Sequence, residues 1–211
     1  MLSVPQLRYS VAKVSIWQRD QIHTVQDALS YISHPQPVQV THPARPGTTL
    51  EAQQQVHIDA LPPILVLHMK RFCYDTGVGG VVKVGKHVRF GPELEIPNGA
   101  HRLSREFQKL KMRFVEVMAP GIRKSWLPRY KLFGVLYHHG LSASGGHYTL
   151  DVLHPTRFTW GGAAGAGGKA REGWVRIDDE LVSDVRHEDV FEAWERDESR
   201  SAYLLFYSRV R

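Results

Sequence analysis

Hydrophobic residues recur at every second position in several short runs of the chain, which is the spacing of strands buried on one side. These runs predict strands at residues 8–18, 64–72, 130–140, 147–153, 174–178 and 201–210. Residues 25–32 instead place their apolar side chains at helical spacing, and Thr24 and Asp27 form a capping-box pattern at the start. We therefore predict a helix over 25–32 and a second short helix within 188–197. Many strands and few helices indicate an α+β fold.

The segments between these runs differ in character. Residues 64–72 are apolar on both faces at their start, which is typical of a central strand. The stretch HPQPVQVTHPARPGTT, residues 34–49, is rich in Pro and predicts a loop. The stretch YDTGVGGVVKVG, residues 74–85, predicts a Gly-rich loop or hairpin. Two further short strands, bounded by Gly and Pro, are predicted at 86–90 and 94–97.

Two segments interrupt the predicted strands and suggest a division of the chain. Residues 99–129 are strongly basic and predict a helical insertion, and residues 161–170 form a low-complexity Gly-rich loop. We expect residues 61–211 to form the main domain. Residues 1–60, with the helix at 25–32, are expected to form the entry to it.

Composition and charge limit the classes of function. The chain has 211 residues, of which 42% are hydrophobic, enough for one sizeable core. The formal net charge of +6 permits an acidic partner but does not require one. The longest apolar run, residues 61–69, is shorter than the ~20 residues that cross a bilayer, and we expect no membrane partner.

The chain has one cysteine, Cys73, so no disulfide can form within it and no Cys-x-x-Cys zinc pair exists. This cysteine usage predicts a reducing compartment, the cytoplasm or the nucleus. We expect no metal site and no cofactor.

The candidate chemistry centres on the stretch SASGGHYTLDV, residues 142–152, where His147 follows two glycines at the start of a strand. A histidine that acts as general base needs a carboxylate to orient its ring. Asp151 lies on the same strand but about 13 Å along it, which is too far. Asp178 and Asp179 end the next predicted strand, and antiparallel pairing would bring that end to His147. We predict the pair His147–Asp178.

A base also needs a nucleophile, and Cys73 is the only thiol in the sequence. It lies inside an extended run, in line with Leu65, Leu67 and Met69. A reactive cysteine is typically found at a helix N-terminus or at a cationic site that lowers its pKa, and here only neighbouring cations are present. The pattern favours a packing role for Cys73, with a nucleophilic role as the alternative.

Four blocks together resemble one enzyme family. LPPILVLHMKRF, YKLFGVLYHHGLSASGGHYTLDV, GWVRIDDELV and SAYLLFYSRV are similar, in this order and spacing, to C-terminal blocks of the ubiquitin-specific protease family. The likeness extends over about residues 50–211, and IHTVQDALSYI adds to it upstream. The resemblance implies a papain-like cysteine peptidase with a hand of fingers, palm and thumb. It also implies hydrolysis of bonds after the C-terminal Gly of ubiquitin, with ubiquitin and ubiquitinated proteins as partners.

The resemblance implies roles for individual residues. His147 matches the general base, Asp178 the orienting acid, and Asp179 an auxiliary polar group near the reacting carbonyl. Gly145, Gly146 and Tyr148 match a wall of the channel that admits the ubiquitin tail. The loop 74–85 matches the opposite wall of that channel.

The sequence departs from the family pattern in one respect. The family's nucleophile lies in a box of the type Gly-x-x-Asn-x-Gly-Asn-x-Cys, which opens a thumb helix, and no such box occurs here. We therefore expect the palm and part of the fingers without a thumb, from the C-terminal portion of a catalytic domain.

Two other functions compete with a deubiquitinase segment. The first is a non-catalytic ubiquitin-binding or scaffold module of the same fold. The second is a nucleic-acid binder that uses the basic residues of 101–129, although the sequence has no recognisable RNA-binding motif. A solvated helix face accounts for those basic residues better, and we expect no nucleic-acid partner.

Overall fold

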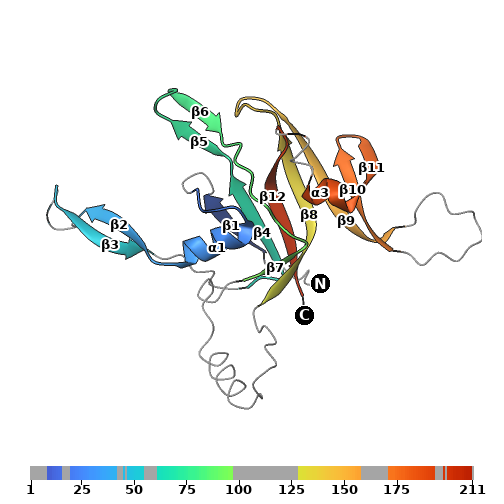
Figure 1. Ribbon diagram of the computed structural model, residues 1–211, viewed down its shortest axis with the longest axis horizontal. Coiled ribbons are helices and arrows are strands. Elements are labelled where there is room, and N and C mark those ends of the chain that lie inside the picture. The colour runs from blue at the N-terminus through green and yellow to red at the C-terminus, as the bar shows by residue number, and fades with distance from the viewer. Residues whose placement is uncertain are drawn as a thin grey trace, which may run out of the picture.

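A mostly antiparallel sheet forms the centre of the molecule (Figure 1). The computed structural model describes residues 9–15, 20–41, 45, 47–54, 61–96, 128–157, 171–192, 197 and 199–210. The sheet order is β1-β4-β12-β8-β9-β10-β11, and β7 pairs with β8 beside this path. Among these described strands, only β1 and β4 pair in parallel. The strands of the sheet are β1 (Tyr9–Ser15), β4 (Ile64–Lys70), β7 (Glu93–Glu95), β8 (Arg129–His139), β9 (His147–Arg157), β10 (Arg171–Asp178), β11 (Leu181–Val185) and β12 (Ser201–Arg209).

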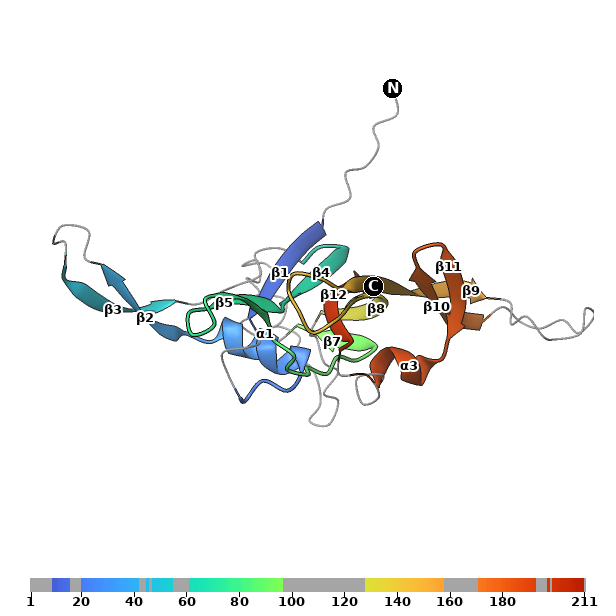
Figure 2. The ribbon, with the colours of Figure 1, turned by 90° about the horizontal axis from the view of Figure 1, so that it is seen from above.

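Two helices cover one face of this sheet (Figure 2). They are α1 (Val25–Ser33) and α3 (His187–Phe191). The capping box predicted for α1 is present, since Thr24 accepts from the Asp27 amide and Asp27 accepts from the Thr24 amide. A single core joins both helices to β4, β8 and β12; its members include Ala28, Leu29, Leu65, Leu67, Met69, Val135, Tyr137, Val190, Leu205 and Tyr207. The predicted helix and the central position of residues 64–70 are therefore confirmed.

Two small ribbons project from the sheet. One joins β2 (Gln36–Thr41) to β3 (Thr49–Gln54), and the other joins β5 (Phe72–Asp75) to β6 (Gly80–Lys83). The second ribbon confirms the hairpin predicted in residues 74–85. The first shows that the loop predicted at 34–49 is wrong for residues 36–41 and 49, which form strands. The Pro residues concealed an alternation that pairs Val38 with Ala52 and Val40 with Leu50, and a ribbon edge tolerates Pro.

Two local deviations matter for the site. The strand predicted at 86–90 is wrong, because this segment forms only a single bridge, between Arg89 and Thr24. In β12, the register shifts between Ala202 and Leu204. Strict alternation would bury Tyr203 beside Leu205, but the shift leaves Tyr203 half-buried, and its ring contacts His68.

Some sequence predictions lie outside the described residues. Residues 99–127 of the basic insertion and the Gly-rich loop 161–170 are among them. The division at residue 60 stays a prediction, although β1 and α1 share a sheet and a core with elements that follow it. Within the described part of the chain, none of the helices has the length and apolar character needed to cross a membrane.

Candidate active site

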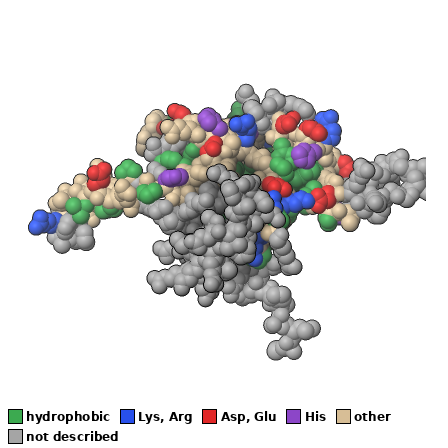
Figure 3. Space-filling view, turned by 60° about the horizontal axis from the view of Figure 1, so that its bottom comes forward, with side chains coloured by type: hydrophobic (Ala, Val, Ile, Leu, Met, Phe, Trp, Pro, Cys, Tyr) green, Lys and Arg blue, Asp and Glu red, His purple; other side chains and the backbone are tan. Residues whose placement is uncertain are grey.

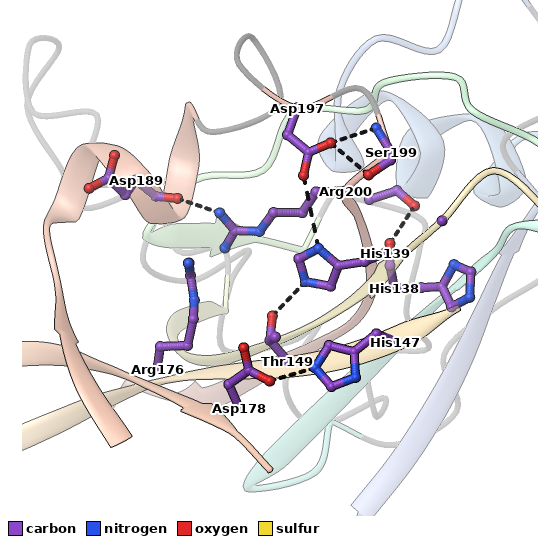
Figure 4. A network of polar contacts seen from close by, with 12 residues as sticks. His138, His139, His147, Thr149, Arg176, Asp178, Asp189, Asp197, Ser199 and Arg200 are labelled. Atoms are coloured by element: carbon purple, nitrogen blue, oxygen red, sulfur yellow. Dashed lines mark hydrogen bonds and ion pairs between the residues drawn. The ribbon is translucent and has the colours of Figure 1, made fainter. Parts of the chain in front are cut away.

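His147 and Asp178 lie together at one end of the sheet, as the sequence predicted (Figure 4). β9 and β10 pair antiparallel, with Asp151 opposite Arg176, so the start of β9 meets the end of β10. Because alternate residues of a strand share a face, His147 and Asp178 point to the same side. Their Nε2 and Oδ1 atoms are 2.5 Å apart.

The environment of His147 is that of an accessible base. Its side chain is 45% exposed and that of Asp178 is 41% exposed. The hydrogen bond to Asp178 raises the pKa of His147, and the charges of Asp178 and Asp179 act in the same direction. Since a carboxylate only accepts, Nε2 donates to Asp178, and Nδ1 is the atom left to exchange a proton. Among the described residues nothing hydrogen-bonds to Nδ1 of His147.

Asp179 completes a compact polar group. It occupies the turn between β10 and β11 with a φ of 50°, a left-handed conformation that Asp adopts more readily than most residues. Single ligand atoms of His147, Asp178 and Asp179 lie within 4.8 Å of one another, close enough to share a cation. Exposed carboxylates often reach this spacing without a metal, so the sequence expectation of no metal site remains an expectation.

The two glycines before His147 have different surroundings. A Cβ on Gly146 would overlap Nε2 of His138 and the carbonyl oxygen of His139. A Cβ on Gly145 would meet no atom within 4 Å. Gly146 is therefore required by the packing of the loop onto His138, a reason that the sequence did not reveal. The packing makes no such demand at Gly145.

Tyr148 belongs to a group of rings on the opposite face of β9. Its ring centroid lies 5.0 Å from that of His138 and 5.9 Å from that of Tyr203. The ring is 45% exposed. Tyr203 in turn lines a depression of about 410 Å³, together with His68, Lys70, Arg71, Phe72, Cys73 and Tyr74. This arrangement joins Tyr148 to the base of the β5–β6 hairpin.

Sequence reasoning missed the buried support below the site. Asp151 is fully buried and accepts two hydrogen bonds from Arg176, at 2.7 and 2.8 Å, and one from Arg200 at 2.8 Å. The Arg200 guanidinium also lies 3.7 Å over the ring of Tyr137 and donates to the carbonyl of Asp189. These contacts tie β9, β10, β8, α3 and the turn before β12 together, and they confirm that Asp151 is not a partner of His147.

His139 was also missed and lies directly beside the predicted base. It pairs with His147 across β8 and β9, and the two ring centroids are 6.0 Å apart. Its Nε2 is hydrogen-bonded to the Thr149 hydroxyl at 2.8 Å, and its Nδ1 is 4.0 Å from Asp197 (Figure 4). Burial, and next the charge of Arg200, lower the pKa of His139. No local sequence signal marks this residue, because its partners come from β9 and from the turn before β12.

Comparison with known proteins decides the family. A family model described as ubiquitin carboxyl-terminal hydrolase matches residues 8–207. The chain belongs to this family. Probable ubiquitin carboxyl-terminal hydrolase 3 of Schizosaccharomyces pombe is 35% identical over 201 residues, which cover 91% of this chain and 33% of that protein. Ubiquitin carboxyl-terminal hydrolase 10 of Rattus norvegicus is 35% identical over 196 residues, covering 92% of this chain and 20% of that protein. The chain thus spans a third or less of the length of these relatives.

Solved structures show the same fold. The Ubp8 deubiquitinase module of SAGA bound to ubiquitin aldehyde matches with a TM-score of 0.59 at 20% identity, over 95% of this chain and 36% of that chain. A variant of the same module bound to monoubiquitin matches with a TM-score of 0.60, at 20% identity, over 95% of this chain and 35% of that one. The predicted α+β, papain-like fold of a ubiquitin-specific protease is confirmed.

Cys73 lies in a position that does not suit a nucleophile. It is on β5, half-buried, and pairs with Val82 in the ribbon. A strand gives it neither helix dipole nor oxyanion donors. Within the described residues it forms no hydrogen bond or ion pair with His147.

Proposed function

We propose that this chain supplies the general base and its orienting acid to a thiol-dependent ubiquitinyl hydrolase. The observation that carries the proposal is the 2.5 Å contact between Nε2 of His147 and Oδ1 of Asp178 at an exposed end of the sheet. Cys-His-Asp hydrolases have the same arrangement. A carboxylate binds one nitrogen of the histidine ring, and the other nitrogen is free to exchange a proton with the thiol.

In this mechanism Nδ1 of His147 takes the proton of a cysteine thiol, and the thiolate attacks the carbonyl carbon of ubiquitin's last glycine. The C–N bond then breaks, and Nδ1–H gives its proton to the departing lysine amine. A water molecule attacks the resulting thioester while Nδ1 accepts its proton. The C–S bond then breaks, ubiquitin leaves as its carboxylate after losing a proton to solvent, and Nδ1–H returns its proton to the thiolate. Asp178 orients the ring and balances the imidazolium charge both while the thioester forms and while it is hydrolysed.

The thiol in this proposal is not Cys73. The family resemblance implies a cysteine in a box of the type Gly-x-x-Asn-x-Gly-Asn-x-Cys, and Cys73 does not match it. Asp179 is proposed as a polar group near the reacting carbonyl, which its position beside His147 supports. Gly145, Gly146 and Tyr148 are proposed to border the ubiquitin tail, which the place of the two glycines directly before His147 supports; Tyr148 is exposed but lies on the opposite face of β9.

Ubiquitin as the partner is supported by the relatives. The curated relatives are named as ubiquitin carboxyl-terminal hydrolases, and two Ubp8 modules of the same fold are bound to ubiquitin aldehyde and to monoubiquitin. A non-catalytic ubiquitin-binding module is the second candidate, favoured by the single cysteine and its place on β5. In Figure 3 the described residues place basic and acidic side chains among one another, and residues 101–127, on which the nucleic-acid alternative depends, lie outside the described part of the chain.

The test is hydrolysis of a fluorogenic C-terminal amide of ubiquitin. The chain is assayed alone and with a supplied N-terminal half that carries the cysteine box. The proposal expects cleavage only with both parts and a loss of cleavage in His147→Ala. His154→Ala is the matched control, because His154 is an exposed histidine on the same strand β9. Ubiquitin binding with no cleavage in the complemented sample would favour the non-catalytic module instead.

A further inference from the structure

Lys83, the last residue of β6, binds three backbone carbonyl groups at once. Its Nζ donates to the oxygens of Gly140 at 2.5 Å, Ser199 at 2.9 Å and His138 at 3.3 Å. An ammonium has three N–H donors, so these acceptors use all of them. Within the described residues no carboxylate pairs directly with Lys83, and the charge of Asp197 acts on it only from a distance.

The three carbonyls belong to two segments that enclose the site. His138 and Gly140 flank His139 at the end of β8, and His139 is the residue opposite His147. Ser199 lies in the turn before β12, and its amide and hydroxyl both donate to Asp197, which faces His139 (Figure 4). One ammonium therefore joins the β5–β6 hairpin to both segments.

The backbone of His147 pairs with His139, and Val82 bridges to Ser142 in the preceding loop, but the side chains of His147 and Asp178 have few packing contacts. Both side chains are more than two-fifths exposed, so packing alone does not hold them. The connection from β8 to β9 begins at Gly140, whose φ is 116°, and ends at Gly146. A Cβ on Gly140 would lie 3.3 Å from the Gly145 oxygen, so the two ends of this loop are closely apposed. What fixes Gly140 therefore also fixes the backbone just before His147.

We propose that Lys83 is a positioning residue for His147, acting through the backbone at the end of β8. The loss of its three hydrogen bonds would let the 140–146 connection shift and would weaken the contact between His147 and Asp178. The ammonium is partly buried, and burial, followed by the charge of Arg71, lowers the pKa of Lys83. The consequence for catalysis rests on the proposed function, whereas the coupling to His147 does not.

The test uses the full chain and the NMR titration of His147. The chain has 12 histidines, so the His147 ring signal is assigned by its loss in His147→Ala. In Lys83→Met the pKa of His147 should fall toward the value measured in Asp178→Asn, because the hydrogen bond with Asp178 is the main cause of its raised pKa. Loss of the Lys83 charge by itself would instead raise the pKa of His147, because a nearby cation disfavours the protonated ring. The other charges that act on His147 come from Asp178, Asp179 and His139.

Lys131→Met is the matched control, since Lys131 pairs with Glu172 on the exposed surface of β8 and should leave the His147 titration unchanged. Lys83→Arg keeps the charge and several donors and should restore part of the shift. Should Lys83→Met fail to fold, Lys83→Gln, which keeps two amide donors, takes its place with a smaller expected fall. An unchanged or increased pKa of His147 in the folded variant overturns the inference.

The catalytic consequence is measured in the complemented assay. Lys83→Met should lower kcat roughly tenfold with little change in KM, since misplacement of a reacting group acts on the rate. If cleavage does not depend on His147, the proposed function fails while the titration result stands. If cleavage depends on His147 but the titration ignores Lys83, only the present inference fails.

Discussion

At the scale of single residues, the two nitrogens of His147 have different environments. Nε2 is held by Asp178, and Nδ1 is available to solvent or to a thiol. This asymmetry fixes which proton can move, because the nitrogen held by the carboxylate keeps its proton throughout the cycle. The role of Asp178 can therefore be separated from that of His147 by substitution.

Asp178→Asn in the complemented enzyme should be less damaging than His147→Ala. Loss of the base removes proton transfer, which is worth roughly 10²- to 10⁴-fold in rate. The Asn side-chain oxygen still accepts a hydrogen bond and orients the ring, as in the Cys-His-Asn sites of papain-like proteases, but it no longer balances the imidazolium. Steady-state kinetics on both variants check the order. Equal losses would show that the carboxylate charge is indispensable, and full activity in Asp178→Asn and Asp178→Ala would remove Asp178 from the site.

The same pair predicts a pH dependence of stability. The pKa of His147 is raised above its ordinary value of 6.5 in the folded chain. The stabilisation from the pair is thus fully present below pH 6.5 and is lost as the pH rises through the folded pKa. The difference in melting temperature between wild type and Asp178→Asn should be larger at about pH 5.5 than at about pH 8.5. A difference that is independent of pH, or that grows with pH, would contradict this.

Gly145 and Gly146 offer a matched pair for testing backbone packing. Gly146→Ala should destabilise the chain by about 1–3 kcal/mol, because its Cβ would be forced against His138 and the His139 carbonyl. Gly145→Ala should change the stability by no more than about 0.5 kcal/mol, since nothing lies within 4 Å of its Cβ. Urea unfolding of both variants checks the contrast, and equal stabilities would refute the packing argument.

Sequence reasoning found His147 and Asp178 because both lie at strand ends, where antiparallel pairing alone brings them together. It could not find Lys83, His139 or Arg200. Their partners are backbone carbonyls and side chains distant in the sequence, set by the register of several strands. The pattern of alternating apolar residues does not reveal a register shift such as that beside Tyr203. The sequence therefore did not predict the group of rings around Tyr148 either.

At the scale of elements, the buried carboxylate of Asp151 lies on the inner side of β9, where apolar side chains are usual. It joins β9 to β10 through Arg176 and to the turn before β12 through Arg200. Removing one partner of a buried ion pair is costly, because it leaves the other charges without compensation in a poorly polarisable environment.

Asp151→Asn should therefore lower the free energy of unfolding by about 3–5 kcal/mol. Glu172→Gln is the control, since it breaks an exposed ion pair with Lys131 and should cost less than about 1 kcal/mol. Chemical denaturation with a common m-value measures both. Similar small losses would mean that Asp151 is better solvated than its complete burial indicates.

The elements that the sequence predicted well are those with strong periodicity and defined ends. α1 has a capping box and an apolar stripe, and β4 is apolar on both faces. β11 was missed because it is short and largely exposed, and its pairing with β10 depends on the tight turn at Asp179. β2 was missed because Pro residues suggested a loop. Exposure weakens the hydrophobic signal, so peripheral strands are the least predictable.

At the scale of the whole molecule, one hydrophobic core packs together the helices and the strands that surround the site. α1 and α3 cover the same face of the sheet (Figure 2). Core residue Tyr137 pairs with Thr149, so Thr149, His147 and Asp151 of β9 point to that face. The family motifs indicated the order of the strands along the chain. They did not indicate that α1 shares a core with the later strands, because that contact joins residues distant in the sequence. The site therefore depends on folding of the whole sheet and not on its local loop alone.

This arrangement predicts that the chain by itself is catalytically silent. The proposed base is in place, but the only thiol is on β5, without a helix N-terminus and without a hydrogen bond to His147 within the described residues. The reporter assay on the chain alone should give no turnover above background, and Cys73→Ala should leave this unchanged. In the complemented enzyme, Cys73→Ala should retain activity, whereas replacing the cysteine of the supplied box should abolish it. Turnover by the chain alone that disappears in Cys73→Ala would reverse the assignment, because it would require Cys73 to approach Nδ1 of His147 in solution.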